Sequence, residues 1–306
     1  MLQADWYIIP PAVEGDYYRD LVRREPDRAQ LLQRHTKNLT PVDGIPFENY
    51  DLVISFDAIL EIPPGLPNIF AYYAQEHWDS LYVRSLQRPI NGYDLFLAHM
   101  VDAPANLQKL PQSVAFPYLH DPEIIRPLFS PPRQEIAWLD WRTATTLANQ
   151  PRDSSWSSET DAALLRAQET FGLPLRSGST KNSKSYFIAD EPSWGDAANY
   201  TRSLAECRYY IGVGRLGGAG QGLGEAAAVG CLCIGQSAQA YHRLICHPSC
   251  LCDDLFDLPA TLRRLRQSPD LQREVLDHQD RHLCLHFRDR PLAALARAIA
   301  LKKAGR

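Results

Sequence analysis

The sequence predicts an α/β protein with two doubly wound domains, each built on a parallel sheet flanked by helices. Three features of the chain support this prediction. Short apolar runs alternate with helical or loop segments, a proline-dense stretch over 122–132 separates two such series, and a glycine-rich segment lies between two apolar runs of the second series. The length of 306 residues allows one large domain or two of about 150 residues.

The first series of apolar runs predicts a domain over residues 1–132. A helix-rich segment over 16–36 is interrupted by Pro26. Compact apolar runs, bounded by polar or proline-containing segments, predict the strands. The expected strands cover 6–9, 51–56, 68–74, 93–98 and 113–116.

The second series predicts a domain over 133–290, followed by an amphipathic helical segment over 291–306. The expected strands cover 135–139, 184–188, 209–213 and 231–234. The expected helices cover 158–171, 197–207 and 221–229, and Gly172 is a stop signal for the first of them. In the terminal helix, Leu292, Leu295 and Ile299 form one apolar stripe, which favours docking on the body of the protein.

Composition excludes several classes of protein. Hydrophobic residues make up 45% and charged residues 22%, as in ordinary globular proteins and unlike disordered chains. No apolar run of 18 residues occurs, and the N-terminus lacks the pattern of a secretion signal. The seven cysteines are odd in number and all follow residue 200, which favours a reducing cytoplasm over a disulfide framework.

The glycine-rich segment over 209–236 carries the clearest chemical signal. It has glycines at 212, 214, 217, 218, 220, 222 and 224. Such a loop lets backbone N–H groups approach a ligand, and a helix beginning near Gln221 directs its positive dipole end to the same place. This pattern indicates a phosphate or diphosphate site. The alternative is a helix that packs tightly through Ala226, Ala227 and Ala228 without a ligand.

The segment resembles the donor-binding domain of the GT-B superfamily of nucleotide-sugar glycosyltransferases. The resemblance is specific over Leu204–Gly212 and Gly222–Cys231, with the Gly-Leu-x-Glu-Ala pattern at 222–226. It extends weakly over about 50–260, through 68–79, 93–99, 116–129 and 135–143. The resemblance implies two Rossmann-like domains facing a cleft, a nucleotide-diphosphate sugar donor held by the second domain, and no requirement for a protein-bound metal.

The loop and the resemblance together predict a set of donor-binding residues in the second domain. Glu225 is expected to accept hydrogen bonds from the ribose, and Arg142 and Arg215 to neutralise the diphosphate. The alternatives are a carboxylate that stabilises the helix dipole and two surface arginines. The full expected set is Arg142, Gly214, Arg215, Gly220, Gln221, Gly222, Leu223 and Glu225.

A base for the acceptor hydroxyl is expected at the carboxyl ends of the first domain's strands. Asp57 follows the strand over 51–56, and Glu76 and His77 follow the next strand. Each alone is equally consistent with a capping or buried structural group. One departure from the family leaves the stereochemistry open. Retaining members often carry two glutamates eight positions apart, and Gly217 stands where the first is expected.

A cluster of possible zinc ligands occurs outside this segment. It comprises His242, Cys246, His247, Cys250 and Cys252. Their residue types suit zinc, but the spacing matches no common structural site. Buried cysteines that act as small hydrophobic residues are the favoured interpretation.

Charge bears on the expected partners. The net charge of −4 argues against a nucleic-acid partner. Residues 261–306 nevertheless hold 11 Lys/Arg against 5 Asp/Glu. A solvated helix is the favoured explanation, and peripheral contact with the inner face of an anionic membrane is the alternative.

The function predicted from these features is transfer of a sugar from a nucleotide-diphosphate sugar to a glycan or lipid-linked hydroxyl, as in polysaccharide biosynthesis. Two alternatives stay open: a non-catalytic scaffold that binds a glycan or nucleotide, and a sugar-nucleotide epimerase. A DNA-modifying glycosyltransferase is disfavoured by the acidic body. The sequence leaves the oligomeric state open.

Overall fold

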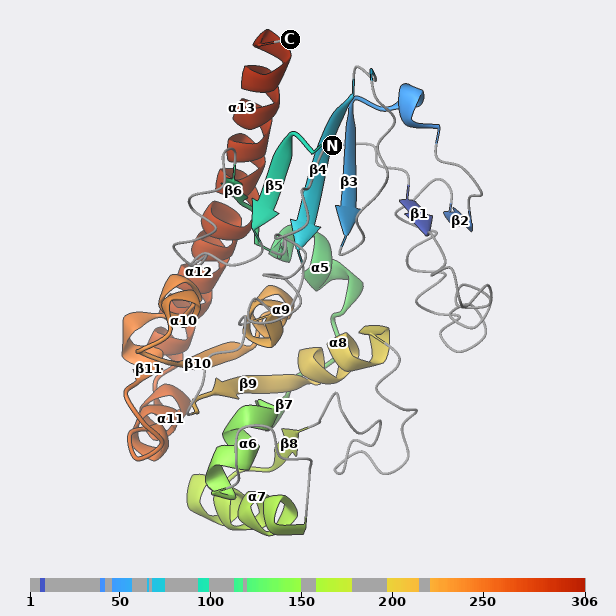
Figure 1. Ribbon diagram of the computed structural model, residues 1–306. Coiled ribbons are helices and arrows are strands. Elements are labelled where there is room, and N and C mark those ends of the chain that lie inside the picture. Colours follow the sequence, from blue (N-terminus) through green and yellow to red (C-terminus); the bar gives the residue numbers. More distant parts are fainter. Residues whose placement is uncertain are drawn as a thin grey trace.

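The computed structural model describes most of the second half of the chain and separate segments of the first. The described residues are 6–8, 39–41, 46–56, 65, 68–74, 93–98, 113–117, 120–149, 158–177, 197–214 and 221–305. Two parallel sheets, each accompanied by helices, dominate this part of the chain (Figure 1). The predicted α/β fold class is therefore confirmed. The helix expected over 16–36 and the strand expected over 184–188 lie outside the described residues.

The first sheet contains four parallel strands in the order β3-β4-β5-β6. Their bounds are Leu52–Phe56 (β3), Ile69–Ala74 (β4), Leu95–Ala98 (β5) and Ser113–Ala115 (β6). Each lies within a predicted strand, because these apolar runs are short and continuous. A separate parallel pair joins Trp6–Ile8 (β1) to Leu39–Pro41 (β2).

The second sheet contains five parallel strands in the order β11-β10-β9-β7-β8. Their bounds are Gln134–Leu139 (β7), Leu175–Ser177 (β8), Cys207–Gly212 (β9), Leu232–Gln236 (β10) and Leu251–Cys252 (β11). The chain runs outward from β7 to β8 and then returns to place β9 on the other side of β7. The strand order thus reverses between β7 and β9, which is where open α/β sheets bind ligands.

Helices cover both faces of the second sheet. Their bounds are Trp141–Leu147 (α6), Ser158–Phe171 (α7), Ala197–Glu206 (α8), Gln221–Val229 (α9), Ala240–Ile245 (α10), Leu258–Gln267 (α11) and Pro269–Cys284 (α12). Side chains of α6, α7 and α11 share one apolar core, and those of α8, α9 and α10 share another. Along β9, Tyr209 and Ile211 enter the first core and Tyr210 the second, as strand alternation requires.

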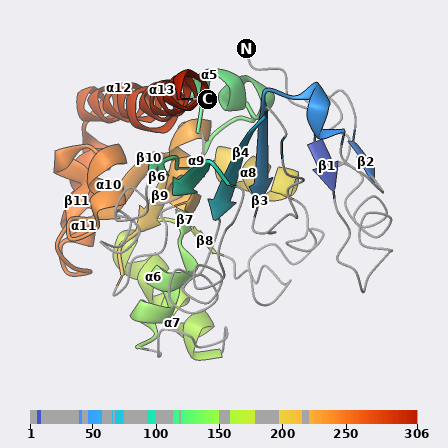
Figure 2. The ribbon, with the colours of Figure 1, turned by 45° about the horizontal axis from the view of Figure 1, so that its top comes forward.

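Two segments connect the sheets. The helix α5 (Pro122–Leu128) follows the first sheet but packs against α9 of the second unit. A π-helical turn, Leu285–Asp289, joins α12 to α13 (Arg290–Ala304), which returns to the first sheet beside β6 (Figures 1 and 2). Arg288 of the turn pairs with Asp121, the N-cap residue of α5. An ion pair therefore joins the π-helical turn to the start of α5.

The terminal helix α13 docks through the predicted apolar stripe. Leu295 is buried in the core of the first sheet, with Leu292 and Ile299 packed against that core. Lys303 near the end of α13 pairs with Asp51, which directly precedes β3. Among the described residues, no helix is long and apolar enough to cross a membrane.

The proline-dense stretch, predicted as a domain boundary, contains the helix α5. Pro122 occupies the first turn of α5, where its missing N–H is not needed, and Asp121 accepts a hydrogen bond from the N–H of Glu123. Pro127 lies close to the helix end, so it removes little helical bonding. The division of the chain into 1–132, 133–290 and 291–306 stays a prediction.

Candidate nucleotide-binding site

The candidate site lies where the strand order of the second sheet reverses. The carboxyl end of β7 leads through Asp140 into α6, and the carboxyl end of β9 leads to Gly214. The strand β9 is followed along the chain by α9, so both helices begin at this edge of the sheet. This edge contains four of the predicted donor-binding residues: Arg142, Gly214, Gly222 and Glu225.

The helix α9 is held at its C-terminal end by two arginines. Arg126 donates to the carbonyl of Ala227 at 3.4 Å, and Arg133 donates to the carbonyl of Val229. These guanidinium groups satisfy carbonyls that the helix cannot bond itself and complement the negative end of its dipole. The N-terminal end, at Gln221, is the end directed at the candidate site.

Gly222 and Gly224 allow large side chains to approach α9 closely. A Cβ atom on Gly222 would lie 2.8 Å from the hydroxyl oxygen of Tyr210 and 3.2 Å from that of Tyr200. A Cβ atom on Gly224 would lie 2.5 Å from Nε2 of His120, whose side chain is buried. Both glycines are therefore explained by packing, whether or not a ligand also uses the exposed backbone.

Glu225 is half-buried on α9, and its carboxylate accepts a hydrogen bond from the hydroxyl of Tyr200. Burial raises the pKa of Tyr200 well above its usual value, and the carboxylates of Glu225 and Asp140 raise that pKa further. The ring of Tyr200 packs edge-on against Trp138 of β7, with centroids 5.5 Å apart. A carboxylate has two oxygens with two lone pairs each, so the hydrogen bond from Tyr200 alone does not saturate it.

Asp140 organises the other half of the site. Its Oδ2 accepts from the hydroxyl of Tyr210 at 2.9 Å, and its Oδ1 accepts from the backbone N–H of Arg142 at 2.9 Å. The second contact caps α6 at its N-terminus. Arg142 is half-buried and lies in the first turn of this helix. Its charge lies near enough to His242 to lower the pKa of that histidine.

His242 is a neutral imidazole at this edge. Burial first, and then the charge of Arg142, lower the pKa of His242 to about 4. Its Nδ1 accepts from the backbone N–H of Gln236 at 2.9 Å, which leaves the ring proton on Nε2. The side-chain oxygen of Gln236 accepts from the N–H of Gly214 at 3.1 Å. The N–H of Gly214 is thus already used within the protein.

The other residues predicted for the donor and acceptor sites are either placed by the structure or lie outside its described residues. Leu223 is buried in the core, so only its backbone can face a ligand. Gln221 is the first residue of α9. The others lie outside the described residues: Asp57, Glu76, His77, Arg215, Gly217 and Gly220. Asp140, Tyr200 and Tyr210 join the site without having been predicted, and only Asp140 had a sequence signal, as an acidic residue directly after a strand.

The side chains of the candidate zinc cluster are buried or make hydrogen bonds within the protein. Cys246, Cys250 and Cys252 are buried thiols, and burial raises the pKa of Cys250 to about 11. Nδ1 of His247 accepts from the N–H of Ser249 at 3.2 Å. In the described ranges of the chain, no group of three His, Cys, Asp or Glu side chains could hold a metal ion.

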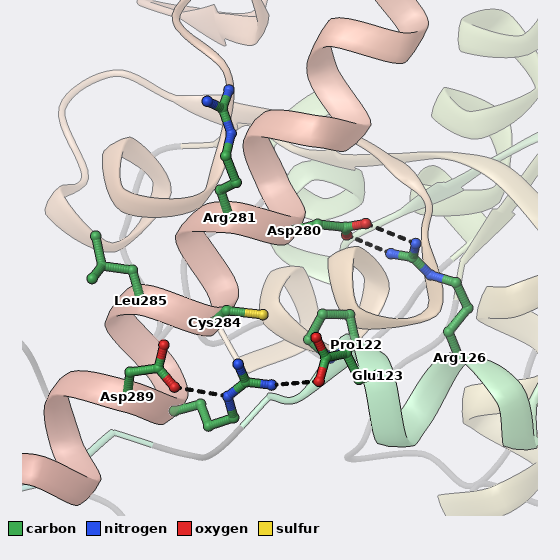
Figure 3. Close-up of a pocket in the computed structure, with 9 residues that line it drawn as sticks. Pro122, Glu123, Arg126, Asp280, Arg281, Cys284, Leu285 and Asp289 are labelled. Atoms are coloured by element: carbon green, nitrogen blue, oxygen red, sulfur yellow. Dashed lines mark hydrogen bonds and ion pairs between the residues drawn. The ribbon is translucent and has the colours of Figure 1, made fainter.

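A separate cavity of about 500 Å³ lies between α5 and the end of α12 (Figure 3). Its charged lining is paired internally: Arg126 binds Asp280 at 2.6 Å, and Arg288 binds Glu123 and Asp289 at 2.9 Å each. Cys284 faces the same cavity. None of the predicted donor-binding residues lines it, so it is distinct from the candidate site.

Comparison with solved structures identifies the fold as GT-B. An α-glucosyltransferase in complex with UDP and a 13-mer DNA aligns with a TM-score of 0.50 at 12% identity, over 83% of this chain and 80% of that one. T4 phage BGT with UDP and Mn²⁺ aligns with a TM-score of 0.46 at 13% identity, over 86% and 88%. Pneumococcal O-GlcNAc transferase GtfA with UDP and GlcNAc gives 0.44 at 11% identity, over 76% of this chain and about half (52%) of GtfA. No family model and no curated protein matches the sequence.

Two expectations from the sequence are corrected by these comparisons. The expectation that no protein-bound metal is required is contradicted, because the T4 phage structure holds Mn²⁺ together with UDP. The described residues themselves offer no cluster suited to a metal ion. The exclusion of a nucleic-acid partner is not supported, because the α-glucosyltransferase structure contains DNA.

Proposed function

We propose that the chain is a glycosyltransferase that moves a sugar from a nucleotide-diphosphate sugar to an acceptor hydroxyl. The observation that carries the proposal is Glu225 on α9, at the edge where the strand order of a GT-B fold reverses. A carboxylate there suits a ribose, and the helix dipole with Arg142 suits a diphosphate. The UDP in the structure of similar fold makes UDP the first nucleotide to test.

In this reaction the bond between the anomeric carbon and the diphosphate oxygen breaks, and a bond from that carbon to the acceptor oxygen forms. The diphosphate leaves with the electron pair, so positive groups at its position lower the barrier. Arg142 and the N-terminus of α9 supply such groups, with Arg215 and the backbone at Gly220 as further donors. A base among Asp57, Glu76 and His77 accepts the proton of the acceptor hydroxyl.

The two sheets divide these roles. We assign the acceptor side to residues 1–132, the donor to 133–290, and a docking role to the helix in 291–306. The free state of all seven cysteines is consistent with a reducing compartment, so we assign the chain to the cytoplasm. This assignment leaves peripheral membrane contact as a secondary possibility for the basic C-terminal segment.

The acceptor belongs to one of two classes. A glycan or lipid-linked hydroxyl suits a protein whose net charge is −4. A hydroxyl on DNA is the alternative, favoured by the DNA present in the α-glucosyltransferase structure. A radiolabelled UDP-sugar offered with each acceptor class separates the two, because label enters only the true acceptor.

Thermal stabilisation by a panel of nucleotides and nucleotide sugars tests the donor site. A ligand at a hundredfold excess over its dissociation constant stabilises the native state by about 2.7 kcal/mol. We expect a shift with one nucleotide that is strongly reduced in Glu225→Gln. Glu274→Gln, which removes an exposed carboxylate from α12, is the matched control and retains the full shift.

The panel also separates the two other candidate functions. Binding without transfer to any acceptor class, and without interconversion of the sugar, identifies a non-catalytic scaffold. Interconversion of the bound sugar without an acceptor identifies an epimerase. No shift with any nucleotide refutes the donor site itself.

A further inference from the structure

We propose that Tyr200 is a positioning residue, which orients the carboxylate of Glu225 for the nucleotide. This inference rests on the proposed donor site and deepens it. Tyr200 belongs to α8 and Glu225 to α9, and these two helices pack against each other on one face of the second sheet. The hydrogen bond between the two side chains is therefore a contact between separate elements.

The position of the Tyr200 hydroxyl is fixed from two sides. Its ring packs edge-on against Trp138, with centroids 5.5 Å apart and an interplanar angle of 75°. Its hydroxyl lies over Gly222, where a Cβ atom would come within 3.2 Å of the oxygen. A hydroxyl held in this way can favour one rotamer of the Glu225 side chain over the others.

The protonation state of the pair supports this direction of hydrogen bonding. Burial raises the pKa of Tyr200, and the charges of Glu225 and Asp140 raise it further, so the phenol stays protonated. A protonated phenol beside a carboxylate donates to it. Hydrogen bonds to a charged acceptor are stronger than neutral ones and are lost in full when the hydroxyl is removed.

Tyr209 provides a control outside the site. It belongs to β9, but its side chain enters the other core of the second sheet. Its hydroxyl donates to Oε1 of Glu135 at 2.7 Å, so this tyrosine also pairs with a carboxylate. Removing either hydroxyl deletes one hydrogen bond from a tyrosine to a carboxylate, but only Tyr200 acts on Glu225.

The test compares affinity for UDP and for its 2′-deoxy analogue by calorimetry in the full chain. If the nucleotide panel selects another base, the same pair of that base is used. We expect the wild type to prefer the ribonucleotide by about tenfold or more, because the 2′-hydroxyl bonds Glu225. Tyr200→Phe should lose most of this preference, whereas Tyr209→Phe should retain it.

A double variant distinguishes positioning from a general loss of structure. If Tyr200 acts through Glu225, Tyr200→Phe/Glu225→Gln is no worse in ribose preference than Glu225→Gln alone. Urea unfolding without ligand measures any structural effect separately. Equal losses of stability in the two tyrosine variants, with loss of preference only in Tyr200→Phe, support the inference.

Two results overturn the inference while leaving the proposed function intact. One is an unchanged ribose preference in Tyr200→Phe, and the other is an equal loss of preference in Tyr209→Phe. A wild type that binds no nucleotide refutes the proposed function, and the inference fails with it. If Tyr200→Phe does not fold, Tyr200→Trp provides a second variant that lacks the hydroxyl, and retained ribose preference in it also overturns the inference.

Discussion

The imidazole rings of His278 and His282 lie stacked on α12, with centroids 3.9 Å apart and an interplanar angle of 18°. Nδ1 of His282 lies 2.9 Å from the carbonyl oxygen of Leu244 on α10. The ring of His247 meets His278 edge-on at 5.2 Å. Histidines therefore contribute to holding α12 against the segment over 240–250.

This relationship predicts that stability falls in mild acid. Burial, followed by the charges of His282, His247 and Arg281, lowers the pKa of His278 to about 4, against about 6.5 in the unfolded chain. The native state then binds fewer protons than the unfolded state between these two values. The free energy of unfolding should be greatest above pH 6.5 and decrease as the pH falls toward 4.

Urea unfolding at a series of pH values between 7.5 and 4.5 measures this slope. His242, whose pKa is also lowered to about 4, contributes in the same direction. The variant His278→Asn keeps a polar side chain but removes one titrating group, so its slope should be smaller without vanishing. A slope identical to that of the wild type would show that His278 does not remain neutral in the fold.

Gly224→Ala should destabilise the protein by about 1–3 kcal/mol, because the new methyl group overlaps the imidazole of His120. Gly305→Ala is the matched control, since the nearest atom to its Cβ would be 3.6 Å away, in ordinary contact. Chemical denaturation measures both. Truncation of the clashing ring in Gly224→Ala/His120→Ala should recover part of the loss, and an additive result would contradict the overlap.

Leu295→Ala should cost about 2–4 kcal/mol, because Leu295 is buried where α13 meets the first sheet. Leu301→Ala on the same helix removes a side chain that is 66% exposed, and its effect should stay within about 0.5 kcal/mol. Differential scanning calorimetry compares the two. Similar small effects in both variants would mean that α13 does not dock on the sheet in solution.

Arg133→Met should lower the free energy of unfolding by about 1–2 kcal/mol, because its guanidinium bonds the carbonyls of Cys207 and Val229. Arg273→Met removes an exposed ion pair with Asp270 and should change stability by less than about 0.5 kcal/mol. Hydrogen exchange on α9 provides a second readout, since protection of the amides in this helix should fall only in Arg133→Met. Unchanged protection would argue against a role at the end of α9.

Several elements could be predicted from the sequence because their signals are local. The helix over 158–171 and the helix over 221–229 agree with α7 and α9 in both bounds. A helix was expected for the basic segment over 261–306, but without the bounds of α11 and α12. The helix α10, with six residues, and β8, with three, were not predicted. Short elements of this kind are stabilised by their packing more than by their own sequence pattern.

The candidate site could be predicted only in part. Glu225 and Gly222 belong to a contiguous motif, so the sequence identifies them together. Tyr200 and Tyr210 approach that motif at Gly222 from other elements, and no local pattern indicates those contacts. Tyr210 also lies in the apolar run over 209–213, where aromatic residues are expected to fill a core.

The return of α13 to the first sheet has a consequence for biosynthesis. The ion pair between Asp51 and Lys303 joins residues 252 positions apart. During translation β3–β6 leave the ribosome long before the helix that buries Leu295 against them. The second sheet and its helices must therefore be synthesised while the face of the first sheet that receives α13 is still exposed. During that period a chaperone could bind the exposed apolar face.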